Sequence, residues 1–221
     1  RTCQKNGSIE IEIPADANIY KMTLGNYLSN EHSKKIAISY EDQKGKIIKF
    51  TFDEVEKMSH GLASKLSSLG YKFGSYVAIH TGQHPDTAIA HMAICKIGGV
   101  AVTLSQLYGP ETLKHAMNDC RVEVLITNKK EWEKIKEKKN NNFPFLKHVI
   151  LREADENKNE ISLLDAYNYK SNFRPNFGSA NDPALLMYTS GSTGKPKGIL
   201  HGHRVLASYK PSINLFFNLS M

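Results

Sequence analysis

Residues 76–104 read YVAIHTGQHPDTAIAHMAICKIGGVAVTL, and this stretch decides the fold. Its first five and last five residues, 76–80 and 100–104, are short apolar runs typical of buried strands. Between them, residues 85–97 carry apolar side chains on one helical face and are followed by a Gly-Gly pair. The stretch therefore predicts a strand, a helix and a second strand, joined by a right-handed crossover that makes the two strands parallel.

The same alternation continues on both sides of this unit. Upstream, residues 36–40 and 47–51 are expected to form a hairpin, and a helix capped by Thr51 or Asp53 runs to Leu69. Downstream we expect helices at 110–119 and 130–139, strands at 122–127, 148–151, 184–189 and 198–201, a surface loop at 153–160 and a polar connection at 170–182. This order predicts an α/β fold, a mainly parallel β-sheet flanked by helices, with a βαβ-type subdomain over residues 35–151.

Composition places the chain among ordinary globular proteins. It has 221 residues, of which 40% are hydrophobic and 23% charged, enough for one good-sized domain with a core or for two small ones. No apolar run approaches the roughly 20 residues needed to cross a bilayer, so no membrane partner is expected. The three cysteines, Cys3, Cys95 and Cys120, are far apart, which disfavours disulfides and zinc and favours a reducing cytoplasm.

The net charge of +7 arises from 29 Lys and Arg against 22 Asp and Glu. Nucleic-acid binding is one meaning of such a balance. The densest run, residues 129–139, mixes both signs as a solvated helix face does, so we expect no nucleic-acid partner. A mild positive field also suits ATP or an acidic substrate.

The segment with the clearest chemistry is residues 188–198, YTSGSTGKPKG, which follows an apolar strand. Its glycines permit positive φ angles and a close approach of the backbone to a ligand, so successive N–H groups can bind an anion. Four hydroxyl side chains can donate to phosphate oxygens, and two lysines supply positive charge. These hydroxyls and lysines belong to Thr189, Ser190, Ser192, Thr193, Lys195 and Lys197.

This segment has two other interpretations, a plain Gly/Ser turn and a Walker A loop. A plain Gly/Ser turn requires neither the hydroxyls nor the lysines. A Walker A loop needs four residues between its glycines, whereas Gly191 and Gly194 enclose two, and Pro196 would obstruct the helix that such a loop opens. The dinucleotide fingerprint G-x-G-x-x-G does not occur in the sequence.

Residues 188–198 resemble the phosphate-loop signature of the adenylate-forming superfamily, which includes acyl-CoA synthetases, peptide-synthetase adenylation domains and luciferases. Further segments that resemble this superfamily are KFTFDEV (49–55), AICKIGGVA (93–101), LYGPETL (107–113) and HGHRVL (201–206). The last two are similar to the acetate and medium-chain acid:CoA ligase branch. The likeness spans roughly residues 20–210, with Thr103 where the family often has Pro.

The resemblance implies that residues 1–221 are the N-terminal part of the adenylation domain, with the phosphate-loop region at 183–221. It implies ATP-dependent activation of a small or medium carboxylic acid as an acyl-adenylate, then thioester formation with coenzyme A, with Mg²⁺ assisting. It also implies roles for individual residues. Lys197 and Thr189 are expected to be catalytic, and the nucleotide is expected to contact Thr189, Ser190, Gly191, Ser192, Thr193, Gly194, Lys195, Lys197 and Gly198. The family's C-terminal domain with its catalytic Lys is absent from these 221 residues, so we expect the chain to be inactive alone.

Two functions of other classes stay open: a phosphate-binding domain of another ATP-using enzyme, and a non-catalytic fragment. His201 and His203 form an H-x-H pair without an evident third ligand, so no metal site is expected. His80, His84 and His91 are expected at surface or helix positions, and Cys95 in the core. The apolar segment 213–219 is expected to be a core helix rather than a membrane helix. Neither the acid nor the oligomeric state can be deduced from the sequence.

Overall fold

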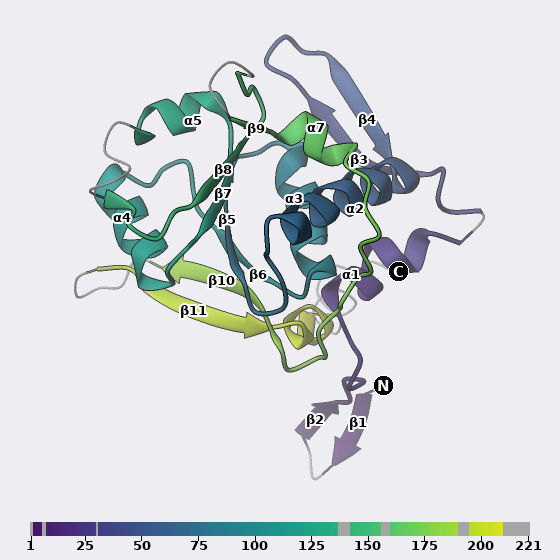
Figure 1. The fold of residues 1–221 in the computed structure, drawn as a ribbon. Coiled ribbons are helices and arrows are strands. Elements are labelled where there is room, and N and C mark those ends of the chain that lie inside the picture. Colours follow the sequence, from purple (N-terminus) through teal and green to yellow (C-terminus); the bar gives the residue numbers. More distant parts are fainter. Residues whose placement is uncertain are drawn as a thin grey trace.

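A computed structural model describes residues 2–5, 8–29, 31–136, 142–155, 160–189 and 195–209. Its centre is a seven-stranded sheet with the order β11-β10-β6-β5-β7-β8-β9, in which only the edge strand β11 runs antiparallel to its neighbour (Figure 1). The strands are β5 (Tyr76–His80), β6 (Val100–Thr103), β7 (Val124–Thr127), β8 (His148–Leu151), β9 (Ile161–Ser162), β10 (Pro183–Thr189) and β11 (Lys197–Gly202). The predicted mainly parallel sheet is therefore confirmed.

Helices cover both faces of the sheet, as Figure 1 shows from its edge. The helices α2 (Phe52–Ser68), α3 (Pro85–Lys96), α1 (Ile19–Met22) and α7 (Leu163–Tyr167) lie on one face, and α4 (Pro110–Asp119) and α5 (Lys129–Glu133) lie on the other. Because side chains alternate along a strand, Val77 and Ile79 of β5 belong to the first core, and Ala78 belongs to the second. The central strands β5, β6 and β7 are thus buried on both faces, as expected of a parallel sheet, whereas β10 and β11 have exposed positions.

Local signals in the sequence explain where α2 and α3 begin and end. Thr51 caps α2 in a capping box with Glu54, whose carboxylate accepts a hydrogen bond of 2.7 Å from the Thr51 N–H. Gly70, with φ +93°, follows the end of this helix. Gly98, with φ +66°, follows α3, and a Cβ there would lie 2.5 Å from the Phe73 ring. The expected helix boundaries near residues 51, 70 and 98 are therefore confirmed.

The order of connections creates a crevice at the carboxyl ends of the central strands. The chain leaves β5 over the first face through α3 to β6, then leaves β6 over the second face through α4 to β7. Connections that leave neighbouring strands toward opposite faces define a topological switch point, where α/β proteins bind ligands at the carboxyl ends of the strands. The carboxyl ends of β5, β6 and β10 lie at this same edge, because the three strands are parallel.

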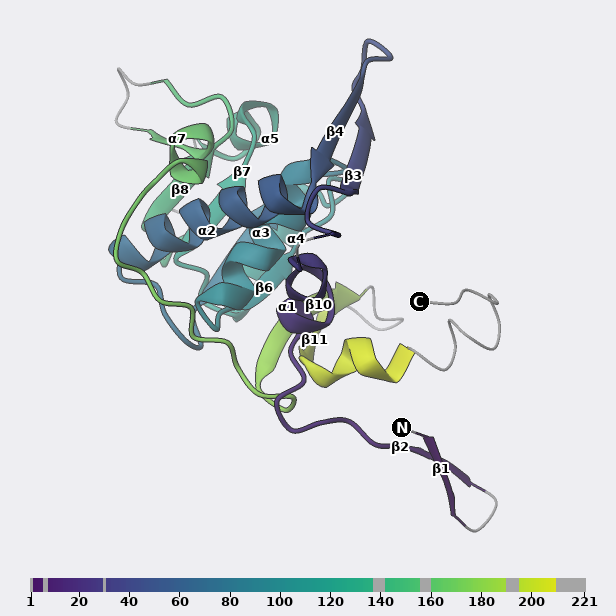
Figure 2. The same ribbon diagram turned by 90° about the vertical axis from the view of Figure 1, so that its right-hand side faces the viewer.

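Several elements differ from the prediction or were not predicted. The strand expected at 122–127 begins at Val124, and the helix expected at 130–139 is shorter, with α5 at Lys129–Glu133. The predicted hairpin is β3 (Ile36–Glu41) and β4 (Ile47–Thr51). A second hairpin of β1 (Thr2–Lys5) and β2 (Ser8–Ile11), a 3-10 turn η1 (Leu24–Tyr27), α1, β9 and α7 were not predicted. In Figure 2 the β1–β2 hairpin stands away from the rest of the fold. The helix predicted at 213–219 lies outside the described residues.

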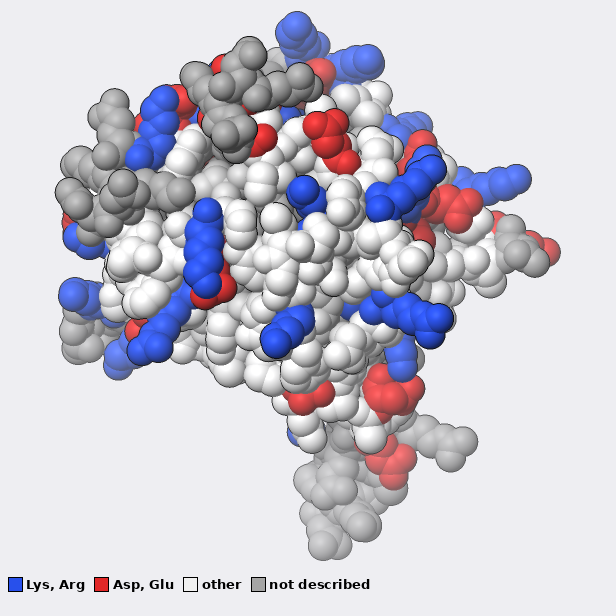
Figure 3. Space-filling view, in the orientation of Figure 1, with Lys and Arg blue, Asp and Glu red and all other residues white. Residues whose placement is uncertain are grey.

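Charged side chains are dispersed over the surface in view. On the face in Figure 3, Lys and Arg are interspersed with Asp and Glu and do not gather into one basic patch. In the described ranges of the chain, no helix has the length and apolar character needed to span a bilayer.

Candidate functional site

The candidate site lies at the carboxyl end of β10, where the glycine-rich segment begins. Thr189 ends β10 and Lys197 begins β11, and the two residues are direct partners in the antiparallel ladder. Ser190, Gly191, Ser192, Thr193 and Gly194 lie outside the described residues, so their predicted contacts with phosphate stay predictions. We call the four described residues Thr189, Lys195, Lys197 and Gly198 the loop flank.

The loop flank presents a hydroxyl and two ammonium groups to solvent. All four of its residues are exposed. Directly opposed residues in an antiparallel pair have Cβ atoms about 4.5–5.5 Å apart on one face, so the Thr189 and Lys197 side chains are neighbours. Tyr188 points to the other face, where it is buried in the second core. The two residues that the sequence predicts to be catalytic are therefore brought together at an open edge.

The lysines of the loop flank are not neutralised by the rest of the described chain. Within those residues, no carboxylate forms an ion pair with Lys195 or Lys197. An exposed, uncompensated pair of ammonium groups beside a hydroxyl fits a polyphosphate, because charge-assisted hydrogen bonds to phosphate oxygens are strong. The donor set of the loop flank thus fits ATP.

The same residues offer little to a metal ion on their own. Across the described ranges, no group of three or more His, Cys, Asp or Glu side chains could hold one. Magnesium in nucleotide sites is held largely by substrate phosphates and water. The Thr189 hydroxyl is the oxygen that the loop flank can contribute to a magnesium ion bound in this way.

A cavity of about 410 Å³ lies at the carboxyl ends of β5 and β6. It is lined by Ile79, Thr81, Gly82, Gln83, Thr87, Thr103, Leu104, Ser105, Gln106 and Leu107, at the ends of β5 and β6. Its hydroxyls have partners inside the protein. The Thr81 and Thr87 hydroxyls are 2.6 Å apart, and the Thr103 hydroxyl lies 3.0 Å from Nε2 of His91. Most polar groups that line this cavity at the switch point therefore already have hydrogen-bond partners inside the protein.

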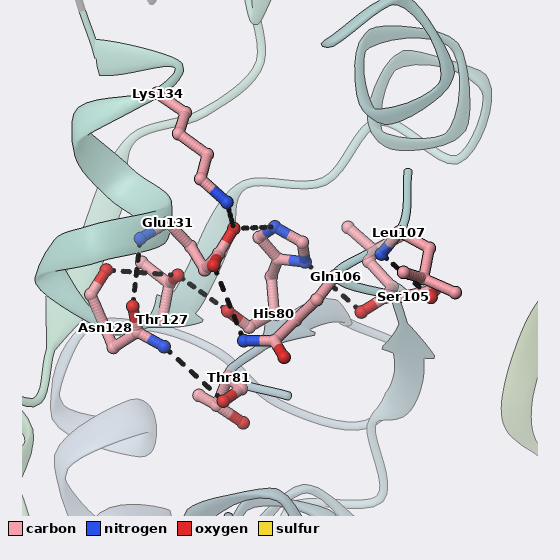
Figure 4. Close-up of polar contacts among 10 residues, drawn as sticks. His80, Thr81, Ser105, Gln106, Leu107, Thr127, Asn128, Glu131 and Lys134 are labelled. Carbon is pink, nitrogen blue, oxygen red and sulfur yellow. Dashed lines mark hydrogen bonds and ion pairs between the residues drawn. The ribbon is translucent and has the colours of Figure 1, made fainter. Parts of the chain in front are cut away.

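A buried polar network, centred on His80 and Glu131, shares Gln106 with the lining of this cavity (Figure 4). His80 is 2% exposed and Glu131 3%, and Nε2 of His80 lies 3.4 Å from Oε2 of Glu131. The Lys134 ammonium donates to the same oxygen at 2.6 Å, and the Gln106 amide donates to Oε1 at 3.5 Å. We call these four residues the His80 network.

The hydrogen bonds of His80 locate one of its protons. Its Nδ1 lies 3.2 Å from the carbonyl oxygen of Leu104, which can only accept, so Nδ1 carries the proton. Burial lowers the pKa of His80, while the Leu104 carbonyl and the Glu131 carboxylate oppose this shift. The His80 network therefore holds the end of β5 and the turn after β6 in place by internal contacts.

The structure corrects one prediction about histidines and refines another. His80 was expected at a surface or helix position, but it ends the buried strand β5, since parallel strands are covered on both faces. His203 lies beyond β11 and is fully buried, with Nδ1 accepting from the Ile19 N–H at 3.3 Å. This hydrogen bond therefore links His203 to the start of α1. Cys95 is buried as predicted, and burial raises its pKa to about 12.

Comparisons with known proteins identify the family. The family described as AMP-binding enzyme matches residues 28–217, so the chain belongs to it. A mycosubtilin synthase polypeptide of Bacillus subtilis is 28% identical over 209 residues, which are 93% of this chain and 7% of that protein. Acetyl-coenzyme A synthetase of Bacillus subtilis strain 168 is 30% identical over 176 residues, 78% of this chain and 30% of that protein. The chain thus spans less than a third of the length of these relatives.

Solved structures show the same fold. A crystal structure of an anthranilate CoA ligase with anthranoyl-AMP matches with a TM-score of 0.81 and 24% identity, over 91% of this chain and 38% of that one. Acetoacetyl-CoA synthetase from Streptomyces lividans matches with a TM-score of 0.81 and 19% identity, over 92% of this chain and 33% of that one. The predicted membership of the adenylate-forming superfamily, and of its N-terminal portion, is confirmed.

Proposed function

We propose that the complete protein containing this chain is an acid:CoA ligase that activates a small or medium carboxylic acid with ATP. In this proposal residues 1–221 are the N-terminal part of the adenylation domain, with subdomains at 35–151 and 183–221. The substrates are ATP, the acid and coenzyme A, with Mg²⁺ bound to the nucleotide, and the protein works in the cytoplasm. The chain alone is inactive.

One observation carries the proposal: Thr189 and Lys197 stand side by side, exposed, at the base of a loop rich in glycines and hydroxyls. The membership of the AMP-binding family and the similarity to acetyl-coenzyme A synthetases support the same activity. The position at the switch-point edge of a parallel sheet supports a ligand site there.

The reaction has two balanced steps. A carboxylate oxygen of the acid bonds to the α-phosphorus of ATP while the bond from that phosphorus to the oxygen bridging to the β-phosphate breaks. Pyrophosphate leaves with that electron pair, and the acyl-adenylate remains. In the second step the sulfur of the coenzyme A thiol bonds to the acyl carbon, AMP leaves, and the thiol proton passes to solvent.

The loop flank acts on the first step by electrostatics. Two anions must approach each other, and charge accumulates on the departing pyrophosphate, so fixed positive groups lower the barrier. In this proposal Lys197 binds the β- and γ-phosphates, and the Thr189 hydroxyl donates to a phosphate oxygen or contacts the magnesium bound there. Lys195 attracts the bound nucleotide as an exposed, solvated charge, and the backbone at Gly198 completes the nucleotide contacts.

Exchange of labelled pyrophosphate into ATP by the complete protein tests this function. We expect exchange that depends on an added acid, compared among acetate, propionate, butyrate and benzoate, with release of AMP when coenzyme A is added. ATP binding without acid-dependent exchange with any acid would favour another ATP-using enzyme. No ATP binding at all would favour a non-catalytic protein.

A further inference from the structure

Side chains from α4 and from the turn before it contact both ends of the glycine-rich loop. The Tyr108 hydroxyl donates a hydrogen bond of 2.7 Å to the carbonyl oxygen of Tyr188, directly before Thr189. Nε2 of His115 lies 2.8 Å from the carbonyl oxygen of Pro196, directly before Lys197. Because a carbonyl oxygen can only accept, Nε2 of His115 carries the proton.

Tyr188 adds a third contact to the same helix. Its hydroxyl donates to Oδ2 of Asp119 at 2.7 Å, and its ring lies edge-on to His115 with centroids 6.2 Å apart. Burial and this hydrogen bond raise the pKa of Tyr188. β11 passes close to that ring, since a Cβ on Gly198 would lie 3.3 Å from it. We call the contacts of Tyr108, His115 and Asp119 with Tyr188 and Pro196 the α4 bracket.

The α4 bracket holds the residues beside Thr189 and Lys197 from a direction that the sheet does not provide. Among the described residues, the ladder between β10 and β11 extends to the pair Thr189 and Lys197, and it holds these two residues only from within the sheet plane. The bracket reaches the same place from the second face. Its helix is itself held rigidly, because Leu113, Ala116 and Met117 are almost fully buried.

We propose that Tyr108 and His115 are positioning residues for phosphate binding, which set the directions of Thr189 and Lys197 through the peptide groups that precede them. The inference rests on the proposed function, since it presumes that the loop flank meets a nucleotide. Its physical reason is preorganisation: when Thr189 and Lys197 are held in place before ATP arrives, the entropy cost of ordering them is not subtracted from the binding free energy.

The chain contains a matched control for this arrangement. At the opposite end of the sheet, the Tyr71 hydroxyl donates to the carbonyl oxygen of Glu123 at 3.1 Å and lies 2.7 Å from Nδ1 of His148. This pair likewise combines a tyrosine, a histidine and a backbone carbonyl, but it lies before β7, away from the loop flank. Tyr71→Phe therefore removes the same kind of bond as Tyr108→Phe does.

Steady-state pyrophosphate exchange by the complete protein is the first test. For Tyr108→Phe and His115→Leu we expect KM for ATP to rise about fivefold to tenfold, as for one lost hydrogen bond, with KM for the acid unchanged. His115→Gln keeps a donor at the same reach, so it should recover KM to within about twofold. Tyr71→Phe should leave KM for ATP unchanged. Equal effects of Tyr108→Phe and Tyr71→Phe, or failure of His115→Gln to recover, would overturn the proposal.

Hydrogen exchange of the backbone amides of Lys195, Lys197 and Gly198 is the second test, and it needs no activity. Both bracket variants should increase exchange there at least about threefold relative to wild type, whereas Tyr71→Phe should not. Unchanged exchange in His115→Leu would overturn the proposal even if activity falls. Increased exchange in a protein that catalyses no pyrophosphate exchange would support the α4 bracket and reject the proposed function, so the two failures are distinguishable.

Discussion

The loop flank and the His80 network lie at the same edge of one sheet but are built in opposite ways. In the loop flank, Lys195 and Lys197 are exposed, and no described carboxylate balances them. In the His80 network, His80 and Glu131 are buried, and each has a polar partner inside the protein. The exposed ammonium groups are free to bind an external anion, whereas the buried groups already satisfy one another. The comparison separates the proposed nucleotide site from a network whose contacts are internal to the fold.

Among the changes that test this comparison, removal of the Lys197 ammonium should have the largest effect on activity. In the complete protein we expect Lys197→Ala to lower the rate of adenylation about 10²-fold to 10³-fold, as for loss of one group that stabilises transition-state charge. Binding of the acid should change little. Pyrophosphate exchange over a range of acid concentrations measures both, and an unchanged rate would mean that Lys197 does not face the phosphates.

The buried side of the comparison should respond to pH through His91, whose Nε2 lies 3.0 Å from the Thr103 hydroxyl in the cavity wall. Burial lowers the pKa of His91 from 6.5 to about 4. Between these values the unfolded chain binds a proton at His91 that the folded protein does not. The contribution of His91 to the free energy of unfolding therefore falls as pH drops through this window and is constant above it. The loss amounts to at most about 3 kcal/mol, at about 1.4 kcal/mol per pKa unit.

Urea unfolding at pH 7 and pH 4.5 checks this expectation, with His91→Gln as the comparison. Burial also lowers the pKa values of His80 and His203, so the stability of both proteins should still depend on pH through these two residues. The variant should lose the His91 share and therefore depend less on pH. Identical pH dependence of the two proteins would show that His91 is free to protonate in the folded state.

Disruption of the His80 network should cost stability and leave phosphate chemistry intact. Glu131→Leu removes the acceptor of Lys134 and Gln106 at a buried position, so we expect a loss of about 2 kcal/mol. Trp132, the only tryptophan of the chain, is adjacent and buried, so its fluorescence can follow unfolding in urea.

Glu123→Leu is the matched control for this variant. Glu123 forms an ion pair with Lys147 in which both side chains are about half exposed, and such pairs contribute roughly 0–1 kcal/mol. If Glu131→Leu cost no more than Glu123→Leu, the network would not be a stabilising element.

The contrast also explains how much of the molecule could be predicted from its sequence. The strand–helix–strand unit at residues 76–104 and the helix at Pro110–Asp119 were predicted because apolar periodicity and end signals are local properties. The motif at residues 188–198 predicted a strand on each side of the segment, and the structure adds that Thr189 and Lys197 are partners in one ladder. Local patterns of this kind need no knowledge of the tertiary fold.

The supporting contacts could not be predicted in the same way. The bonds from Tyr108 to Tyr188 and from His115 to Pro196 join residues 80 and 81 positions apart. No periodicity links such positions, and only the pairing of β6 with β10 brings them together. The burial of His80 was within reach, because it ends a wholly apolar strand between two predicted parallel neighbours. The histidine was interpreted by residue type, and its place in the strand was the stronger signal.

The smallest effect is expected at Lys195, and it tests how open the loop flank is. This lysine is exposed and lies outside the β10–β11 ladder, so its ammonium acts on the nucleotide as a solvated charge. Lys195→Ala should raise KM for ATP only about twofold to fivefold at low ionic strength, and the difference should vanish near 0.5 M salt, since the Debye length is then only a few ångströms. The effect of Lys197→Ala on the rate should persist at that salt, because a contact with the departing phosphates is screened much less. Pyrophosphate exchange at both ionic strengths measures this. A salt-independent effect at Lys195 would place both lysines in direct contact with the phosphates, and the loop flank would then be a closed grip around the nucleotide.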